Sequence, residues 1–340
     1  MRAKVGFFSG LYRSRFVAVV HSGSPYITVY PWSGSGFGAK FSNPGTTPTG
    51  TAQNVAFSTS SNLIAVAHGN SPRISVYPWS NSGFGTKFSD PATLPAGNAL
   101  SVAITRASDA IAVGHQGTPF VSVYPWSASG FGTKFSGPAT LPAGQGNGVA
   151  FSPSGDAIAV AHNTTPFISV YPWSGSGFGT KFSNPGTLPA NNGNGVTFSP
   201  TGDAIAIAHT FTPFIAVYAW SSSGFGTKFS NPATVPANTG QNATFSSDQQ
   251  YIAIPHNITP FISVYPWSGS GFGTKFSDPA TLPPGTCTGA AFTSHGDAIA
   301  LSSSTTPFIV AYPWSASGFG TKFSDPATLP ANISQDIAFG

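Results

Sequence analysis

The chain has 340 residues and a net charge of +4, and only 6% of its residues are charged, whereas soluble domains usually have about 25%. It contains nine Asp and no Glu, so paired carboxylates for acid/base catalysis are not expected. The single cysteine, Cys287, excludes an intramolecular disulfide framework, and no apolar stretch approaches the roughly 18 residues that a membrane span needs. With 40 Gly and 31 Pro, the composition favours a turn-rich all-β protein with no membrane insertion.

The chain begins with a basic segment, residues 1–15. Arg2, Lys4, Arg13 and Arg15 carry the whole net charge, because the other nine bases balance the nine Asp. A basic end on a neutral domain favours a solvated segment or a contact with a protein partner over nucleic-acid binding, which needs a basic face on the fold. The apolar run at 5–8 is too short for a signal peptide, so a cytoplasmic location is expected.

From Tyr30 onward the chain is a tandem repeat. The block Tyr-Pro-Trp-Ser recurs every 47 residues, with one variant, Tyr-Ala-Trp, at 218–220. It contains every tryptophan of the chain: Trp32, Trp79, Trp126, Trp173, Trp220, Trp267 and Trp314. A period of 40 to 50 residues with several short strands is typical of a β-propeller blade, so the repeat predicts a single seven-bladed propeller over residues 1–340.

Residues 147–190 show how one repeat predicts four antiparallel strands. Residues 148–152 and 157–162 are short apolar strands separated by the turn 153–156. Residues 167–171 are rich in strand formers, and Pro172, which lacks an amide donor, is expected to end or bulge that strand. After the turn at 175–177, residues 178–182 are expected to form a weaker outer strand.

These segments resemble known repeat families. The run Phe151 to Asp156, the strand Ala157–Ala161 and the segment Ile168 to Trp173 resemble three strands of a WD40 repeat, over the whole chain. Ser174 stands where WD40 repeats have Asp, and no Gly-His pair precedes the first strand, so the structural network of that family is not expected in its usual form. The nearly uniform sequence of the repeats also resembles repeat proteins encoded among tailed-phage virion genes.

The C-terminus carries an extra copy of the first strand. Residues 335–340 keep the 47-residue register, whereas the N-terminal copy at 5–7 is about three residues out of step. We therefore expect the C-terminal strand to close the ring beside residues 16–21, which removes exposed strand edges.

The loop between the third and fourth strands is almost constant and offers candidate ligand-binding residues on one uniform face. The aromatic candidates are Phe37, Phe84, Phe131, Phe178, Phe225, Phe272 and Phe319. The basic candidates are Lys40, Lys87, Lys134, Lys181, Lys228, Lys275 and Lys322. These residues could form several weak glycan-binding sites that together bind a repetitive glycan strongly. Alternatively, the phenylalanines could simply stabilise their hairpins. The loops on the opposite face vary and suit a specific partner.

Histidines and aspartates recur in the repeat, but their placement favours structural roles. The histidines His21, His68, His115, His162, His209 and His256 end the second strands, too far apart around a ring to share a metal ion. We expect these histidines and the repeat tryptophans to be structural. Asp109, Asp156, Asp203 and Asp297 fall in turns that side-chain-to-backbone bonds explain.

These patterns together predict a non-catalytic binding or assembly module without cofactor, metal or catalytic residues. A protein partner or a larger symmetric assembly is expected, with virion attachment as the context. The alternative is a multivalent, lectin-like propeller that binds surface glycans.

Overall fold

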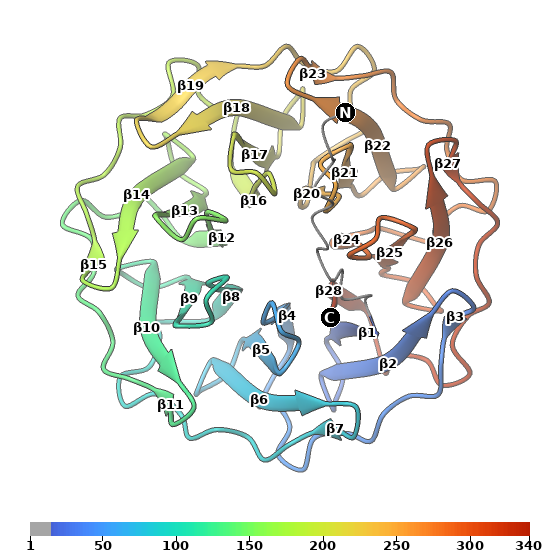
Figure 1. Ribbon diagram of the computed structural model, residues 1–340, viewed down its shortest axis with the longest axis horizontal. Helices are drawn as coiled ribbons and strands as arrows, with labels where there is room; N and C mark the ends of the chain where they lie inside the picture. The colour runs from blue at the N-terminus through green and yellow to red at the C-terminus, as the bar shows by residue number, and fades with distance from the viewer. Residues whose placement is uncertain (1–14) are drawn as a thin grey trace, which may run out of the picture.

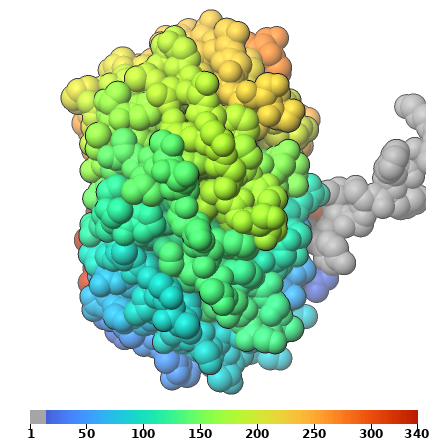
Figure 2. All heavy atoms as spheres, turned by 90° about the vertical axis from the view of Figure 1, so that its left-hand side faces the viewer, coloured from blue at the N-terminus to red at the C-terminus, as the bar shows by residue number. Residues whose placement is uncertain are grey.

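The computed structural model describes residues 15–340, and within that range it contains seven four-stranded antiparallel sheets and no helix. The sheets stand as blades around a central channel, so the chain is a seven-bladed β-propeller (Figure 1). The side view shows neighbouring blades packed into a continuous outer wall (Figure 2). Residues 15–340 contain no helix that is long and apolar enough to span a membrane.

The first two strands of each blade lie nearest the channel. The innermost strands are β28 (Ser334–Phe339), β4 (Ala52–Phe57), β8 (Ala99–Ile104), β12 (Gly146–Phe151), β16 (Gly193–Phe198), β20 (Thr244–Phe245) and β24 (Ala290–Phe292). The second strands are β1 (Phe16–His21), β5 (Leu63–His68), β9 (Ala110–His115), β13 (Ala157–His162), β17 (Ala204–His209), β21 (Tyr251–Pro255) and β25 (Ala298–Ser302).

The remaining strands form the outer part of the ring. The third strands are β2 (Ile27–Ser33), β6 (Ile74–Ser80), β10 (Val121–Ser127), β14 (Ile168–Ser174), β18 (Ile215–Ser221), β22 (Ile262–Ser268) and β26 (Ile309–Ser315). The fourth strands are β3 (Gly36–Phe37), β7 (Gly83–Phe84), β11 (Gly130–Phe131), β15 (Gly177–Phe178), β19 (Gly224–Lys228), β23 (Gly271–Phe272) and β27 (Gly318–Phe319).

The ring is closed by strands from the two ends of the chain. The C-terminal strand β28 pairs antiparallel with β1, with Ala338 opposite Ala18. The amide of Arg15 donates to the carbonyl of Gly340 at 2.7 Å, and the Tyr30 hydroxyl donates to the Thr328 carbonyl at 2.7 Å. One blade therefore contains both ends of the described chain, and β1 has no free edge.

The core lies between the blades and follows the alternation of small and large residues. In one cluster, Ala157, Ala159 and Ala161 of β13 pack against the Ile205 and Ile207 face of β17. Both faces are buried, with alanine opposite the larger β-branched residues. Close packing of this kind lets two twisted sheets approach without leaving a void. The apolar core therefore needs no charged residue.

Proline in the third strand shortens the fourth strand instead of ending the third. The expectation that Pro172 would end or bulge its strand was wrong, because β14 continues to Ser174 and pairs with β13 without a register shift. The amide of Trp173 donates inward to the Asp156 carbonyl, so the ring of Pro172 replaces an amide that would face outward. The outer strand β15 is only two residues long, whereas β19 has five residues where Ala219 replaces the proline. An amide at this position thus allows the outer strand to extend.

Candidate functional site

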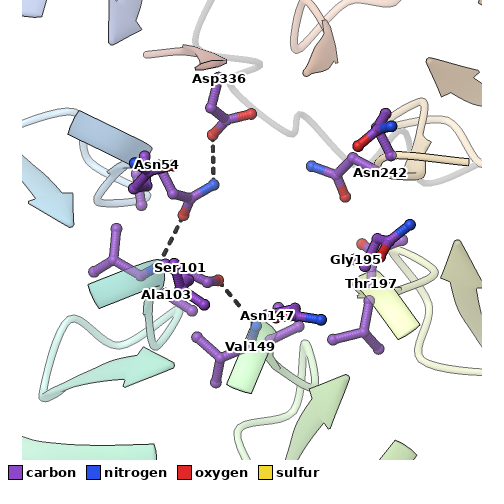
Figure 3. Close-up of a pocket in the computed structure, with 18 of the residues that line it drawn as sticks. Asn54, Ser101, Ala103, Asn147, Val149, Gly195, Thr197, Asn242 and Asp336 are labelled. Atoms are coloured by element: carbon purple, nitrogen blue, oxygen red, sulfur yellow. Dashed lines mark hydrogen bonds between the residues drawn. The ribbon is translucent and has the colours of Figure 1, made fainter. Parts of the chain in front are cut away.

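The seven innermost strands line a polar cavity of about 700 Å³ in the central channel (Figure 3). Its wall extends from loop residues such as Asn163 and Asn192 to Phe57 and Phe151 at the far ends of β4 and β12. The volume is within the range of pockets that hold small molecules. The channel is therefore the candidate functional site in the described part of the chain.

Amide side chains dominate the wall of this cavity. The ten Asn and Gln residues among those that line it are Gln53, Asn54, Gln145, Asn147, Asn163, Asn192, Asn194, Gln241, Asn242 and Gln335. Each amide offers a hydrogen-bond donor and an acceptor, as a ligand hydroxyl does. The wall thus suits a ligand with many hydroxyl groups.

One carboxylate, Asp336 of β28, belongs to the cavity wall. Its side chain is buried, and Oδ2 accepts hydrogen bonds from Asn54 Nδ2 at 2.5 Å and from the Val55 amide at 3.3 Å. Burial raises the pKa of Asp336 to about 7, against the opposing effect of the Ile337 and Val55 amides. A carboxyl group that titrates near neutrality can exchange a proton with a substrate or water.

Hydrogen bonds hold the wall near Asp336 across neighbouring blades. Asn54 Oδ1 accepts from the Val102 amide at 2.8 Å, and Ser101 Oγ accepts from the Val149 amide at 2.9 Å (Figure 3). Because Asn54 also donates to Asp336, its position is fixed from both sides. The network therefore orients the carboxylate before any ligand binds.

Glycines make room for two of the channel side chains. At Gly289, one repeat before Asp336, a Cβ atom would collide with Asp336 Oδ1. At Gly195 a Cβ atom would lie 2.5 Å from Asn242 Oδ1. The carboxylate and this amide thus occupy the space that a side chain of the preceding blade would fill.

Sequence reasoning missed Asp336, although a signal was present. The other eight aspartates lie in turns and loops, whereas Asp336 lies inside an innermost strand. The equivalent positions in the other repeats hold Asn54, Ser101, Gly148, Gly195, Asn242 and Gly289. An acid within a strand that lines the channel differs from every repeat neighbour, and this difference could have identified it.

In the fourth blade, the predicted ligand-binding residues of the uniform face make contacts within the fold. Phe178 is half-buried, and its ring meets Trp173 and Tyr171 edge to face at centroid distances of 5.1 and 5.5 Å. Lys181 Nζ donates to the Phe182 carbonyl at 3.4 Å and to Asn184 Oδ1 at 2.5 Å. Burial also lowers the pKa of Lys181. These contacts are sufficient to explain why both residues recur.

Of the basic N-terminal residues, Arg2, Lys4 and Arg13 lie outside the described residues. Arg15 is exposed at the closure of the ring, where its carbonyl accepts from the Trp32 amide at 2.7 Å. The repeat tryptophans are buried between blades. Trp173, for example, packs edge to face against Phe135 and Phe151.

The repeat histidines are buried and pair with the third strand. His162 Nε2 lies 3.0 Å from Ser169 Oγ, and His68, His115 and His256 form the same pair with Ser75, Ser122 and Ser263. Desolvation by burial lowers the pKa of each repeat histidine to about 4, so these side chains are neutral at pH 7. Among residues 15–340 no group of His, Cys and Asp is arranged to hold a metal ion.

His209 lacks this partner, because Ala216 stands where the other five blades with a repeat histidine have Ser or Thr. Both ring nitrogens of His209 are buried without a hydrogen bond among the described residues. We expect Ala216→Ser to stabilise the protein by about 1 kcal/mol by supplying the missing bond. The denaturant midpoint measures the change. Ser169→Ala in the neighbouring blade is the matched control and should cost about as much. A lower midpoint for Ala216→Ser would contradict the expected gain.

Solved structures share this fold over nearly their full length, although no protein-family model and no curated protein sequence matches the chain. A functionally unknown protein from Desulfotomaculum acetoxidans is 15% identical, with a TM-score of 0.70 and coverage of 96% of this chain and 99% of that one. A propeller from Bacteroides uniformis, provisionally assigned as a 6-phosphogluconolactonase, is 14% identical, with a TM-score of 0.71 and coverage of 96% and 99%. The periplasmic gluconolactonase of Pseudomonas aeruginosa is 14% identical, with a TM-score of 0.68 and coverage of 95% and 98%.

These likenesses correct three expectations. The prediction of a non-catalytic binding or assembly module, with a glycan-binding alternative, is contradicted by propellers of the same fold that are named as lactonases. The exclusion of enzyme activity fails for the same reason. The cytoplasmic expectation is corrected too, since one of these propellers is periplasmic. At these identities the comparisons show the fold of this chain, a seven-bladed propeller shared with lactonases.

Proposed function

We propose that the protein hydrolyses a small polyhydroxylated lactone in its central channel, with Asp336 as the general base. The observation that carries this proposal is the single buried carboxylate in an amide-lined cavity, with its pKa raised to about 7. The names of similar propellers support the reaction class.

The reaction needs only proton transfer and a positioned water molecule. Asp336 takes a proton from water, and the resulting hydroxide attacks the carbonyl carbon of the ring ester. The tetrahedral intermediate collapses with cleavage of the ring C–O bond, and the proton passes from Asp336 to the departing oxygen. The product is the open-chain hydroxy acid, and Asp336 returns to its ionised form.

The remaining channel residues would bind and orient the substrate. Asn147 and Asn194 each use one amide N–H on the backbone of the next blade, at 2.8 and 2.9 Å. Asn147 Oδ1 also accepts from Gln145 Nε2 at 3.0 Å, whereas the second amide N–H of each side chain remains for a ligand hydroxyl. Rigid amides of this kind can also donate to the oxyanion that forms during the attack, which lowers the barrier.

The test is hydrolysis of D-glucono-1,5-lactone by the full chain, measured as proton release above the spontaneous rate. We expect Asp336→Asn to lower kcat/KM by at least about 100-fold, because removal of a general base typically costs that much. The wild-type value should rise about tenfold per pH unit below the pKa of about 7 and level off above it.

Asp156→Asn is the matched control, since it makes the same chemical change in a turn remote from the channel wall. It should leave kcat/KM unchanged. Full activity in Asp336→Asn, or no acceleration over the spontaneous reaction, would disprove the proposed function.

A further inference from the structure

We propose that the channel selects uncharged lactones and disfavours phosphorylated ones, an inference about substrate class that rests on the proposed function. It depends on the charges of the cavity wall. Among the described residues, the wall contains no Lys, Arg or His, and Asp336 is its one charged group. A ligand in the channel therefore meets amides, hydroxyls, apolar groups and one acid.

Several basic groups of the described chain make their contacts outside the cavity. Arg73 donates to the Gly69 carbonyl at 3.3 Å and to Asn98 Oδ1 at 2.9 Å, outside the cavity wall. Lys87, Lys275 and Lys322 form ion pairs with Asp90, Asp278 and Asp325 in the outer part of the ring. The repeat histidines are sealed within the blades. None of these groups lines the cavity.

Phosphate recognition depends on cations or on a converging set of backbone amides. Arginine and lysine neutralise the charge of a phosphate and donate strong hydrogen bonds to it. In this channel a phosphate dianion would instead share the cavity with the Asp336 carboxylate, and the two negative charges would repel each other. A neutral hydroxyl group has no such penalty and matches the amides of the wall.

The size of the cavity is consistent with the same class of ligand. About 700 Å³ accommodates a monosaccharide ring together with bound water. Asn54, Asn242 and Asp336 point into this shared space from three different blades (Figure 3). A sugar ring within it can contact several amides at once.

The experiment measures binding without requiring turnover. The probes are D-glucono-1,5-lactam, in which an amide replaces the ring ester, and its 6-phosphate, titrated calorimetrically into the full-length protein. We expect the lactam to bind at least tenfold more tightly than its phosphate. The gap should narrow as the salt concentration rises, because salt screens the repulsion.

Thr197→Lys is a matched variant that adds a cation to the cavity wall at a position labelled in Figure 3. It should improve binding of the phosphate at least fivefold relative to binding of the neutral lactam. Equal or tighter binding of the phosphate by the wild-type protein would overturn the inference, and so would failure of the neutral lactam to bind.

The outcomes separate this inference from the proposed function. Hydrolysis that depends on Asp336 but prefers a phosphorylated lactone would keep the function and overturn the selectivity. Selective binding of the neutral lactam without hydrolysis would support the selectivity and disprove the function.

Discussion

The protein is expected to lose most of its stability between pH 6.5 and pH 4. Each of the six repeat histidines has its pKa lowered by burial from 6.5 to about 4, so the unfolded chain binds protons in this window and the folded chain does not. Their stabilising contribution is complete above pH 6.5 and decreases as the pH falls towards 4. Each histidine accounts for at most about 1.4 kcal/mol per pH unit.

At pH 5 the six histidines together lower the free energy of unfolding by about 12 kcal/mol as an upper limit. This loss is comparable with the whole stability of many domains. Asp336 acts in the opposite direction, because its pKa is raised and its protonation favours the folded state as the pH falls from 7. Protonation of Asp336 raises the free energy of unfolding by about 2 to 3 kcal/mol at pH 5, so the histidines determine the overall pH dependence.

Denaturant titrations at pH 7.5, 6.5, 5.5 and 4.5 measure this loss. His209→Ser places in the fifth blade the residue that the seventh blade already has at Ser303. It should reduce the pH dependence by about one sixth, since one of six equivalent groups is removed. A stability that stays constant between pH 6.5 and 4.5 would show that burial does not suppress protonation of these histidines.

The second large effect is expected from Gly289→Ala. Its Cβ atom would collide with Asp336 Oδ1, and it would lie 2.9 Å from Asp336 Cα and 3.1 Å from the Ile337 nitrogen. The side chain or backbone of Asp336 must therefore shift, which misplaces the general base. We expect kcat/KM for lactone hydrolysis to fall at least about 100-fold, because small displacements of reacting groups cost about that much.

Activity must be measured on protein shown to be folded, because the added atom also presses on the closing strand. Gly186→Ala is the control for loss of a glycine, since a Cβ atom there meets nothing within 4 Å. Gly195→Ala presses instead on Asn242 and should weaken ligand binding while the pH profile keeps its midpoint. If Gly289→Ala leaves both the rate and the pH midpoint unchanged, Asp336 is not the base.

Much of the architecture could be predicted from local pattern. The 47-residue period, the alternation of alanine with isoleucine or valine, and the turn residues predict the blades, and the structure confirms the seven four-stranded sheets. Pro172 was misinterpreted because the effect of a proline depends on the direction in which the missing amide would point. That direction depends on the pairing of β13 with β14.

The candidate site could not be predicted in the same way. Asp336 and Asn54 are 282 residues apart in sequence and meet only because the last strand closes the first blade. The outer lysines and phenylalanines recur in every blade, and a ligand-binding role for them stays a prediction. The proposed base, Asp336, is instead the one acidic residue in the innermost strands of the described chain.

The sequence by itself determined the blade, because strand alternation and turn chemistry act over a few residues and were repeated seven times. Only the tertiary structure decided the channel, because its wall takes a few side chains from each blade. Burial in that closed ring, a property of no single repeat, raises the pKa of Asp336.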